Sequence, residues 1–399
     1  MTSGVGNQHA RKLLTAFGLP QAVFTQPQLA LKQVVSAAMA QALQTIPENF
    51  EAQLKTTQDW LEAGTLDPNS GQNNRVFLTL ADSRYPSSLL NIEDPPLVLY
   101  LQGHVDLIWQ LDPQAKHERK AASEKSPYKH AKDGIAMVGS RNPTPQGLAT
   151  AHAFAQAFTQ AGLVVVSGLA LGIDGAAHEG ALDGQQSKDK DDGCTIAVIG
   201  TGLDRVYPSK HLALAHRIVE HGLMVSEFPL GTPPLPANFP KRNRIISALS
   251  LGTLVVEAAV KSGSLITARL ANEQGKEVFA IPGSIHSTQS RGCHALLKQG
   301  AKLVESAQDV LEELRLQLTP PLVPPSRLLQ ASSADTIAIE QIEPDDLVKS
   351  LGYDPVSLDA LVARTGWDAA TLQVRLMELE LDDQVARLPG GLYQRVVIG

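Results

Sequence analysis

Short, continuous apolar runs separated by helical stretches constrain the fold of this chain most strongly. Runs such as Leu163–Ser167 and Leu223–Ser226 do not alternate with charged residues, which is typical of strands buried on both faces of a parallel sheet. The predicted strands are Val76–Leu80, Leu97–Leu101, Ile135–Val138, Leu163–Ser167, Thr195–Ile199, Leu223–Ser226, Leu254–Glu257 and Val278–Ile281. Helices are predicted between them, including Gly147–Gln160, His211–His221 and Ser264–Gln274. This alternation predicts an α/β fold with a doubly wound, mostly parallel sheet.

The regions around this core have different compositions. Apolar residues recur at helical spacing through Gln28–Leu43 and Ile46–Leu61, which predicts a small N-terminal helical domain. Two polar insertions, Pro113–Asp133 and Gln185–Gly193, are expected to be surface loops. The predicted divisions are a helical domain at 1–74, the α/β domain at 75–318, a Pro-rich linker at 319–336 and a C-terminal domain at 337–399.

The C-terminal region has the pattern of a winged helix. A helix over Ser357–Arg364 has a serine at its N-cap position, and a second helix spans Ala369–Leu381. A hairpin of Val385–Leu388 and Leu392–Val397 follows. Winged helices often bind DNA. Here, however, the charged residues of the second helix and of the segment after it are mainly acidic and would repel phosphates. A protein contact is therefore favoured over DNA binding for this region.

Composition excludes several classes of protein. With 43% hydrophobic and 19% charged residues, the 399-residue chain has the composition of a soluble globular protein. Its 2 cysteines, Cys194 and Cys293, exclude a disulfide scaffold and a cysteine-rich zinc module. No apolar run approaches the roughly 20 residues of a membrane span, and the N-terminus lacks a signal-peptide stretch. We therefore expect a cytoplasmic protein without a membrane partner.

Charge is unevenly distributed along the chain. The whole chain carries −7, yet the segment from Arg205 to Gly300 holds 11 basic and 5 acidic residues, a net of +6. The segment from Ala301 to the end holds 8 basic and 16 acidic residues, a net of −8. An anionic ligand of the middle segment would explain the asymmetry, although surface charge also fluctuates along any long chain.

Three successive strand ends open into small, glycine-containing loops that lead to helices. They are Gly139-Ser140-Arg141, Ser167-Gly168-Leu169 and Gly200-Thr201-Gly202. In doubly wound folds, ligands bind beyond the carboxyl ends of the strands, and helix N-termini there attract anions. The guanidinium of Arg141 suits a phosphate. Tight turns alone would also explain any one of these loops, but three together favour an anion site.

A cluster of cations follows at Phe239-Pro240-Lys241-Arg242-Asn243-Arg244, where a helix is predicted to begin. Cations in the first helical turn oppose the helix dipole, and a bound anion would offset this penalty. At about 100° per residue, Arg242 and Arg244 point to nearly opposite sides, so one of them can be structural. Phe239 suits stacking on a base, and filling the core is an equal alternative.

Further candidates lie on either side of this helix. In Lys261-Ser262-Gly263-Ser264, the last serine is predicted to be an N-cap or to hold a phosphate, and Lys210 adds another cation. Asp174 and Glu257 suit acid–base chemistry, although helix capping and a satisfied core carboxylate are the simpler alternatives. Gly200-x-Gly202-x-x-Arg205 lacks the third glycine of a dinucleotide fingerprint, and no nucleotide-hydrolase, zinc-protease or serine-hydrolase motif occurs. No cofactor or metal is predicted.

Taken in order, these motifs resemble the DNA-processing protein A (DprA/Smf) family. The resemblance rests on six segments and covers about residues 75–305. The segments are Gly139–Thr144, Ser167–Asp174, Gly200–Asp204 with Tyr207-Pro208, Phe239–Ser247, Lys261–Ala268 and Glu277–Gly283. The helical N-terminus and winged-helix tail also resemble domains that many members carry.

The resemblance implies an extended Rossmann fold that binds single-stranded DNA, forms a homodimer and loads the RecA recombinase during natural transformation. It implies protection of the incoming strand, a possible single-strand-binding-protein partner and no catalytic activity. Some members have a lysine where Pro236 stands here, and Lys241 is a candidate substitute. The residues carried over as DNA contacts are Gly139, Ser140, Arg141, Ser167, Gly168, Lys210, Phe239, Lys241, Arg242, Asn243, Arg244, Lys261, Gly263 and Ser264.

Two alternatives from other classes remain. The segment Gly252-Thr253-Leu254-Val255-Val256-Glu257 loosely resembles nucleotide-monophosphate phosphoribohydrolases, but their Pro-Gly-Gly-x-Gly-Thr motif is absent. The second alternative is a transcription factor that binds duplex DNA through the winged helix. The acidic charge of this region argues against it. The acidic tail also suggests an autoinhibitory DNA mimic that competes for the basic segment.

Overall fold

The computed structural model describes residues 2, 4–64, 74–111, 132–185, 194–314, 346–351, 355–382 and 384–396. Most of both predicted polar insertions, the whole predicted linker and the end of the predicted hairpin lie outside these residues. The chain forms two compact units. The first comprises Met1–Ala136, Val166–Leu169 and Ser187–Leu251, and the second comprises Met137–Val165, Ala170–Gln186 and Gly252–Gly399. These units cut across the predicted domain bounds, which stay a prediction.

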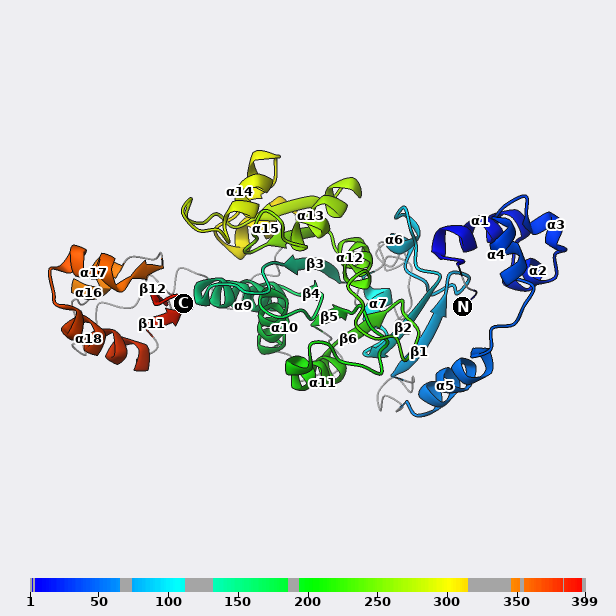
Figure 1. Cartoon of the computed structure of the whole chain (residues 1–399), viewed down its shortest axis with the longest axis horizontal. Helices are drawn as coiled ribbons and strands as arrows, with labels where there is room; N and C mark the ends of the chain where they lie inside the picture. Colours follow the sequence, from blue (N-terminus) through cyan, green and yellow to red (C-terminus); the bar gives the residue numbers. More distant parts are fainter. Residues whose placement is uncertain are drawn as a thin grey trace. The chain divides into compact units, whose positions relative to one another are not determined.

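A nine-stranded sheet has the order β1-β2-β6-β5-β4-β3-β7-β8-β9. Figure 1 labels β1 to β6 of this sheet. Its strands are β1 (Arg75–Thr79), β2 (Val98–Gly103), β3 (Asp133–Val138), β4 (Leu163–Ser167), β5 (Thr195–Val198), β6 (Leu223–Ser226), β7 (Gly252–Val255), β8 (Glu277–Ala280) and β9 (Lys302–Leu303). β5 pairs with β6 in parallel, as do β7 with β8 and β8 with β9. β1 and β2 form an antiparallel hairpin that joins β6 antiparallel. The predicted α/β, mostly parallel fold is therefore confirmed.

The central strands have the burial that their sequences predict. Every residue of β4, β5, β6 and β7 is buried. β4 and β6 have the predicted bounds, because each run is apolar until its terminal serine. β7 ends at Val255, two residues before its predicted end at Glu257.

The helices of the first unit include four short N-terminal helices and the cation-rich helix α12. They are α1 (Asn7–Phe17), α2 (Pro20–Phe24), α3 (Gln28–Leu31), α4 (Ala37–Ala42), α5 (Phe50–Glu62), α6 (Ser87–Leu90), α7 (Leu107–Gln110), η1 (Ser209–His211), α11 (Leu212–His221) and α12 (Asn238–Ala248). Residues between Leu13 and Leu43 form a separate apolar core. Within the stretch Gln28–Leu43, whose helical spacing predicts a small helical domain, α3 ends at Leu31 and Ser36 caps α4.

Helix α5 packs on the edge of the sheet in the same unit. The indole of Trp60 lies edge-on to Tyr100 of β2 at 5.9 Å between ring centroids. Arg75 of β1 lies over the Trp60 ring at 5.3 Å and donates to the Trp60 backbone oxygen at 3.0 Å. Side chains of the β1–β2 pair therefore contact α5 through Trp60.

In the second unit, α9 and α10 pack at very short range. The helices of this unit are α9 (Pro145–Gln160), α10 (Ile173–Gly184), α13 (Ser264–Glu273), α14 (Arg291–Lys298), α15 (Ala307–Glu313), α16 (Asp346–Leu351), α17 (Leu358–Thr365) and α18 (Ala369–Leu381). A Cβ atom at Gly180 of α10 would lie 2.1 Å from the backbone oxygen of His152 in α9. The contact therefore requires glycine at this position.

The C-terminal residues have the predicted winged-helix elements. The Ser357 side chain accepts a hydrogen bond from Ala360 N at 3.2 Å and caps α17. α18 has the predicted bounds, and β11 (Val385–Leu388) pairs antiparallel with β12 (Leu392–Arg395), which also pairs with β10 (Val356–Ser357). Leu361, Leu376 and Tyr393 contribute to its core.

We predict that Gly180→Ala destabilises the protein by about 1–3 kcal/mol, because the added methyl group meets a backbone oxygen that has little room to move. Urea denaturation measures this change. Gly263→Ala is the matched control, since nothing lies within 4 Å of a Cβ there, and it should be nearly neutral. Equal unfolding midpoints for the two variants would contradict the tight contact.

Candidate nucleic-acid interface

The loop after β5 holds the beginning of α12 in the first unit. The Asn238 side chain donates to the Gly200 backbone oxygen at 3.1 Å. A Cβ at Gly200 would lie 3.1 Å from a ring carbon of Phe239. The absence of a side chain at Gly200 thus lets the Phe239 ring lie over the backbone that leaves β5. Phe239 is half-buried, so it both packs inward and remains accessible.

Arg242 turns inward from the next turn of the same helix. Its guanidinium donates to the backbone oxygen of Val198, the last residue of β5. A Cβ at Gly168, just after β4, would lie 2.2 Å from Arg242 Cζ, so glycine makes room for the guanidinium. Arg242 is only 4% exposed. The structure therefore brings Gly168 and Arg242 together, with the arginine buried at the carboxyl ends of two strands.

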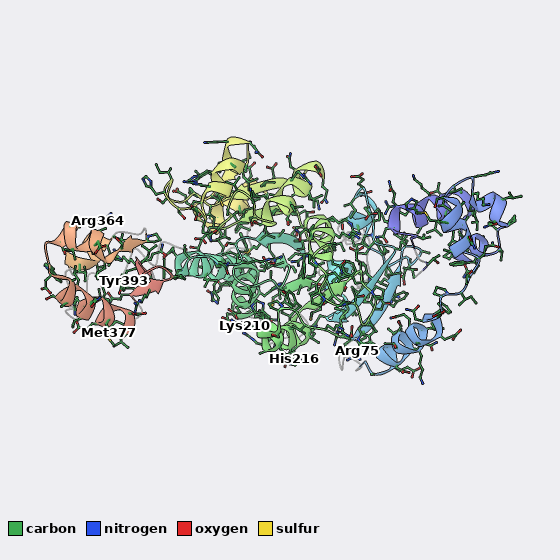
Figure 2. The ribbon with its side chains drawn as sticks, viewed as in Figure 1. Arg75, Lys210, His216, Arg364, Met377 and Tyr393 are labelled. Carbon is green, nitrogen blue, oxygen red and sulfur yellow. The ribbon has the colours of Figure 1, made fainter. Side chains whose placement is uncertain are left out.

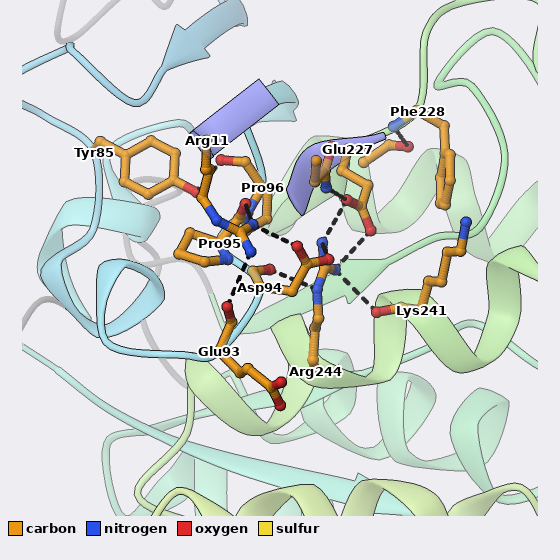
Figure 3. A network of polar contacts seen from close by, with 12 residues as sticks. Arg11, Tyr85, Glu93, Asp94, Pro95, Pro96, Glu227, Phe228, Lys241 and Arg244 are labelled. Atoms are coloured by element: carbon orange, nitrogen blue, oxygen red, sulfur yellow. Dashed lines mark hydrogen bonds and ion pairs between the residues drawn. The ribbon is translucent and has the colours of Figure 1, made fainter. Parts of the chain in front are cut away.

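Arg244 points in a different direction and forms a buried ion pair. Its two terminal nitrogens donate to the two carboxylate oxygens of Glu227, each at 2.6 Å, and Nε donates to the Asp94 backbone oxygen at 2.8 Å (Figure 3). The Arg244 and Glu227 side chains are 10% and 7% exposed. The predicted divergence of Arg242 and Arg244 is confirmed, and both arginines are buried and hydrogen-bonded within the fold.

The same network fastens α1 onto the first unit. Arg11 forms an ion pair with Asp94 and donates to the backbone oxygens of Glu93 and Pro95 at 3.0 and 3.2 Å. Asn7 donates to Glu227 at 3.1 Å. Figure 3 shows Arg11 and Arg244 converging on Asp94. The Arg244–Glu227 pair thus holds α12, the β6 end and α1 in one polar cluster.

Two aromatic rings lie next to each other at this edge. The Tyr207 and Phe239 ring centroids are 5.6 Å apart with an interplanar angle of 40°. Tyr207 is 49% exposed. The exposed Lys210 is near Tyr207 in sequence, and the exposed Lys241 is near Phe239. The His211 ring lies 3.0 Å from the Leu169 backbone oxygen through Nδ1, which ties η1 to the loop after β4. Sequence reasoning singled out Phe239 but missed its pairing with Tyr207.

The Gly139-Ser140-Arg141 loop belongs to the second unit. The Ser140 hydroxyl accepts from Asn142 N at 3.1 Å, and its backbone oxygen accepts from Ile173 N at 3.1 Å at the start of α10. A Cβ at Gly139 would lie 2.6 Å from the Ile173 side chain, which explains the glycine. Ser140 is 6% exposed, whereas Arg141 is exposed. Of this loop, Arg141 is the side chain accessible to a ligand.

Glu257 holds Thr144, the N-cap residue of α9, in this unit. Its carboxylate accepts from Thr144 N at 2.9 Å and from Thr144 Oγ1 at 2.6 Å. A Cβ at Gly147 would lie 2.5 Å from the carboxylate carbon. Burial raises the pKa of Glu257, while the Thr144 hydrogen bonds act to lower it. The carboxylate is committed to a helix N-terminus, as the simpler alternative predicts.

Gln289 joins the Arg141 loop to Ala258, in the segment between β7 and the Lys261–Ser264 turn. The Gln289 side chain donates to the Asn142 backbone oxygen at 2.7 Å, and its backbone oxygen accepts from Ala258 N at 2.7 Å. Lys261 is exposed. The predicted N-cap at Ser264 is wrong, because Gly263 occupies that position and Ser264 N donates to the Ser262 hydroxyl at 3.3 Å. Sequence reasoning did not find Gln289, which lies in none of the motifs.

The predicted site residues thus fall into two groups. The cations Arg141, Lys210, Lys241 and Lys261 are exposed and Phe239 is half-buried. The buried residues are Ser140, Ser167, Gly168, Arg242, Asn243, Arg244 and Ser264. Within the described residues, no three His, Cys, Asp or Glu side chains are grouped to hold a metal, and no helix is long and apolar enough to cross a membrane.

The fold and these motifs are those of a known family of DNA-processing proteins. The family model described as DNA recombination-mediator protein A matches residues 125–315, and the model of the DprA winged helix domain matches residues 326–391. The chain is 37% identical to Protein Smf of Escherichia coli, over 80% of this chain and 77% of that protein. This chain belongs to the DprA/Smf family.

Other members support the same assignment. DNA processing protein DprA of Streptococcus pneumoniae is 43% identical over 59% of this chain and 73% of that protein. The X-ray structure of the Streptococcus pneumoniae protein matches with a TM-score of 0.61 at 35% identity, covering 78% of this chain and 94% of that chain. The similarity therefore extends from sequence to fold.

We predict that Arg244→Met and Glu227→Gln each destabilise the protein by about 3–5 kcal/mol, because each leaves one buried group without its partner. The double variant Arg244→Met/Glu227→Gln should lose clearly less than the sum of the two. Urea denaturation of the four proteins gives the coupling free energy. Additive losses would show that the two side chains do not act as a pair.

Proposed function

We propose that this protein binds single-stranded DNA, protects the incoming strand and loads a RecA recombinase onto it in natural transformation, without catalysing a reaction. The observation that carries the proposal is the accessible pair Tyr207–Phe239 beside the exposed cations Lys210 and Lys241. Single-strand binders combine stacking rings with a basic surface that follows the backbone, and they need no base-specific hydrogen bonds.

The names of its relatives support the biological role. The matching family model is described as a recombination mediator, and curated members are named DNA processing protein DprA. A mediator transfers a strand to a recombinase, so RecA is the proposed partner. A homodimer and a single-strand-binding protein complete the proposed set of partners.

The groups of the proposed site suit DNA binding rather than nucleotide hydrolysis. Glu257, the carboxylate that a phosphoribohydrolase would need, accepts two hydrogen bonds from Thr144. Incubation with AMP tests this alternative directly. Release of free adenine, abolished by Glu257→Gln, would overturn the non-catalytic proposal.

We expect Phe239→Ala to weaken binding to a fluorescent 20-nucleotide dT strand about 5- to 150-fold, since stacking contributes about 1–3 kcal/mol per base. Tyr207→Ala should weaken it by a similar or smaller factor, and Tyr207→Phe should retain the affinity. Fluorescence anisotropy at fixed salt measures these constants.

The control for both variants is Phe24→Ala, which removes a phenylalanine that is 56% exposed at the end of α2. It should bind as the wild type does. If Phe239→Ala lost affinity for the dT strand and Tyr207→Ala did not, only Phe239 would stack on a base, and the proposed role of the ring pair would be wrong. Unchanged affinity in both would remove this edge from the proposed interface.

We predict that Lys241→Gln lowers the slope of log K against log salt by about 0.7, the value for one phosphate contact on a single strand. Lys241 is exposed at the start of α12, two residues from Phe239. Lys55→Gln, in the exposed part of α5, is the matched control and should leave the slope unchanged. Equal slopes for wild type and Lys241→Gln would place Lys241 outside the phosphate path.

A further inference from the structure

Helix α18 of the winged helix has apolar side chains on two faces. One set, Leu372, Leu376 and Leu379, is buried in the winged-helix core. The other set is exposed, with Val374 at 63%, Met377 at 64% and Leu381 at 75%. The core therefore accounts for only half of the large apolar residues of this helix.

The exposed set forms one stripe. At about 100° per residue, positions 374, 377 and 381 fall within an arc of roughly 60°. Figure 2 labels Met377 on the side of α18 away from Tyr393, which belongs to the core. We call Val374, Met377 and Leu381 the α18 stripe. Single exposed apolar residues are ordinary on protein surfaces, whereas a helical row of three suits a partner helix.

The border of the α18 stripe is acidic. Glu378 follows Met377, Glu380 precedes Leu381, and Asp382 lies directly after the helix. The one basic residue of α18, Arg375, donates to Glu378 at 2.6 Å, so its charge is compensated within the helix. A surface with this balance repels phosphates, even though the second helix of a winged helix often contacts DNA.

We propose that the α18 stripe docks a basic amphipathic helix of a protein partner. Leucine-type side chains of that helix would cover the stripe, and its lysines or arginines would meet Glu378, Glu380 and Asp382. Charge complementarity selects this occupant over a second copy of the same helix, because two copies would set the same carboxylates against each other. This role is separate from the proposed DNA interface.

Three synthetic 14-residue peptides test the proposal on the full-length protein. The first has leucines at helical spacing on a lysine background, the second is its scrambled form and the third replaces lysine by glutamate. We expect fluorescence anisotropy to show binding of the first, with the other two at least 10-fold weaker. Equal binding of the scrambled peptide would reduce the interaction to unspecific charge attraction and overturn the proposal.

The double variant Met377→Asn/Leu381→Asn locates the contact. It should lower the affinity for the helical peptide at least 10-fold. The unfolding midpoint should stay unchanged, because both side chains are exposed. Ile285→Asn is the matched control, since Ile285 is 72% exposed in the same unit but outside the winged helix, and it should bind as the wild type does. Equal weakening by both variants would overturn the α18 assignment.

Sedimentation velocity tests the alternative occupant of the α18 stripe, a second copy of this chain. Self-association of the wild type that disappears in Met377→Asn/Leu381→Asn would assign the α18 stripe to a second copy and overturn the proposal. An unchanged mass in this variant, together with loss of peptide binding, supports the partner helix. Failure of the wild type to bind the dT strand would affect only the proposed function and not this result.

Discussion

The Arg244–Glu227 ion pair is the interaction on which the arrangement of the first unit depends. Two charges are removed from water there, and the cost is offset only because both oxygens of Glu227 accept from Arg244 and the remaining donors reach Asp94 and Lys241 backbone oxygens. A buried bidentate pair restricts the rotation of α12 about its axis. The hydrogen bonds of Asn238 to Gly200 and of Arg242 to Val198 act on the same helix.

With α12 in this orientation, its side chains have different surroundings. Arg242 turns toward Val198 and Gly168 and closes the carboxyl end of the sheet. Phe239 lies against Gly200 and Tyr207, and Lys241 remains exposed. The cationic sequence of α12 therefore serves two purposes, because its arginines hold the fold while its lysine and aromatic ring remain accessible for the proposed DNA strand.

The winged helix and the α/β core differ in the ligands that their surfaces suit. The core exposes cations and stacking rings near its strand ends, whereas α18 exposes aliphatic side chains between carboxylates. A mediator needs both kinds of surface if one part holds a nucleic acid while another part contacts a protein. The net charges of +6 and −8 in the two segments already show this contrast.

The sequence by itself determined eight strands of the nine-stranded sheet, the two helices and hairpin of the winged helix, and the opposite directions of Arg242 and Arg244, because burial on both faces and helical rotation leave local patterns. It indicated a helix after the loop Ser167–Leu169 but did not define the bounds of α10, where 10 residues are buried and no amphipathic period exists. Only the tertiary structure decided that Arg244 pairs with Glu227, that Tyr207 lies against Phe239, and that Gln289 joins two loops. These contacts join residues far apart in the chain, and their geometry depends on packing that no local spacing encodes.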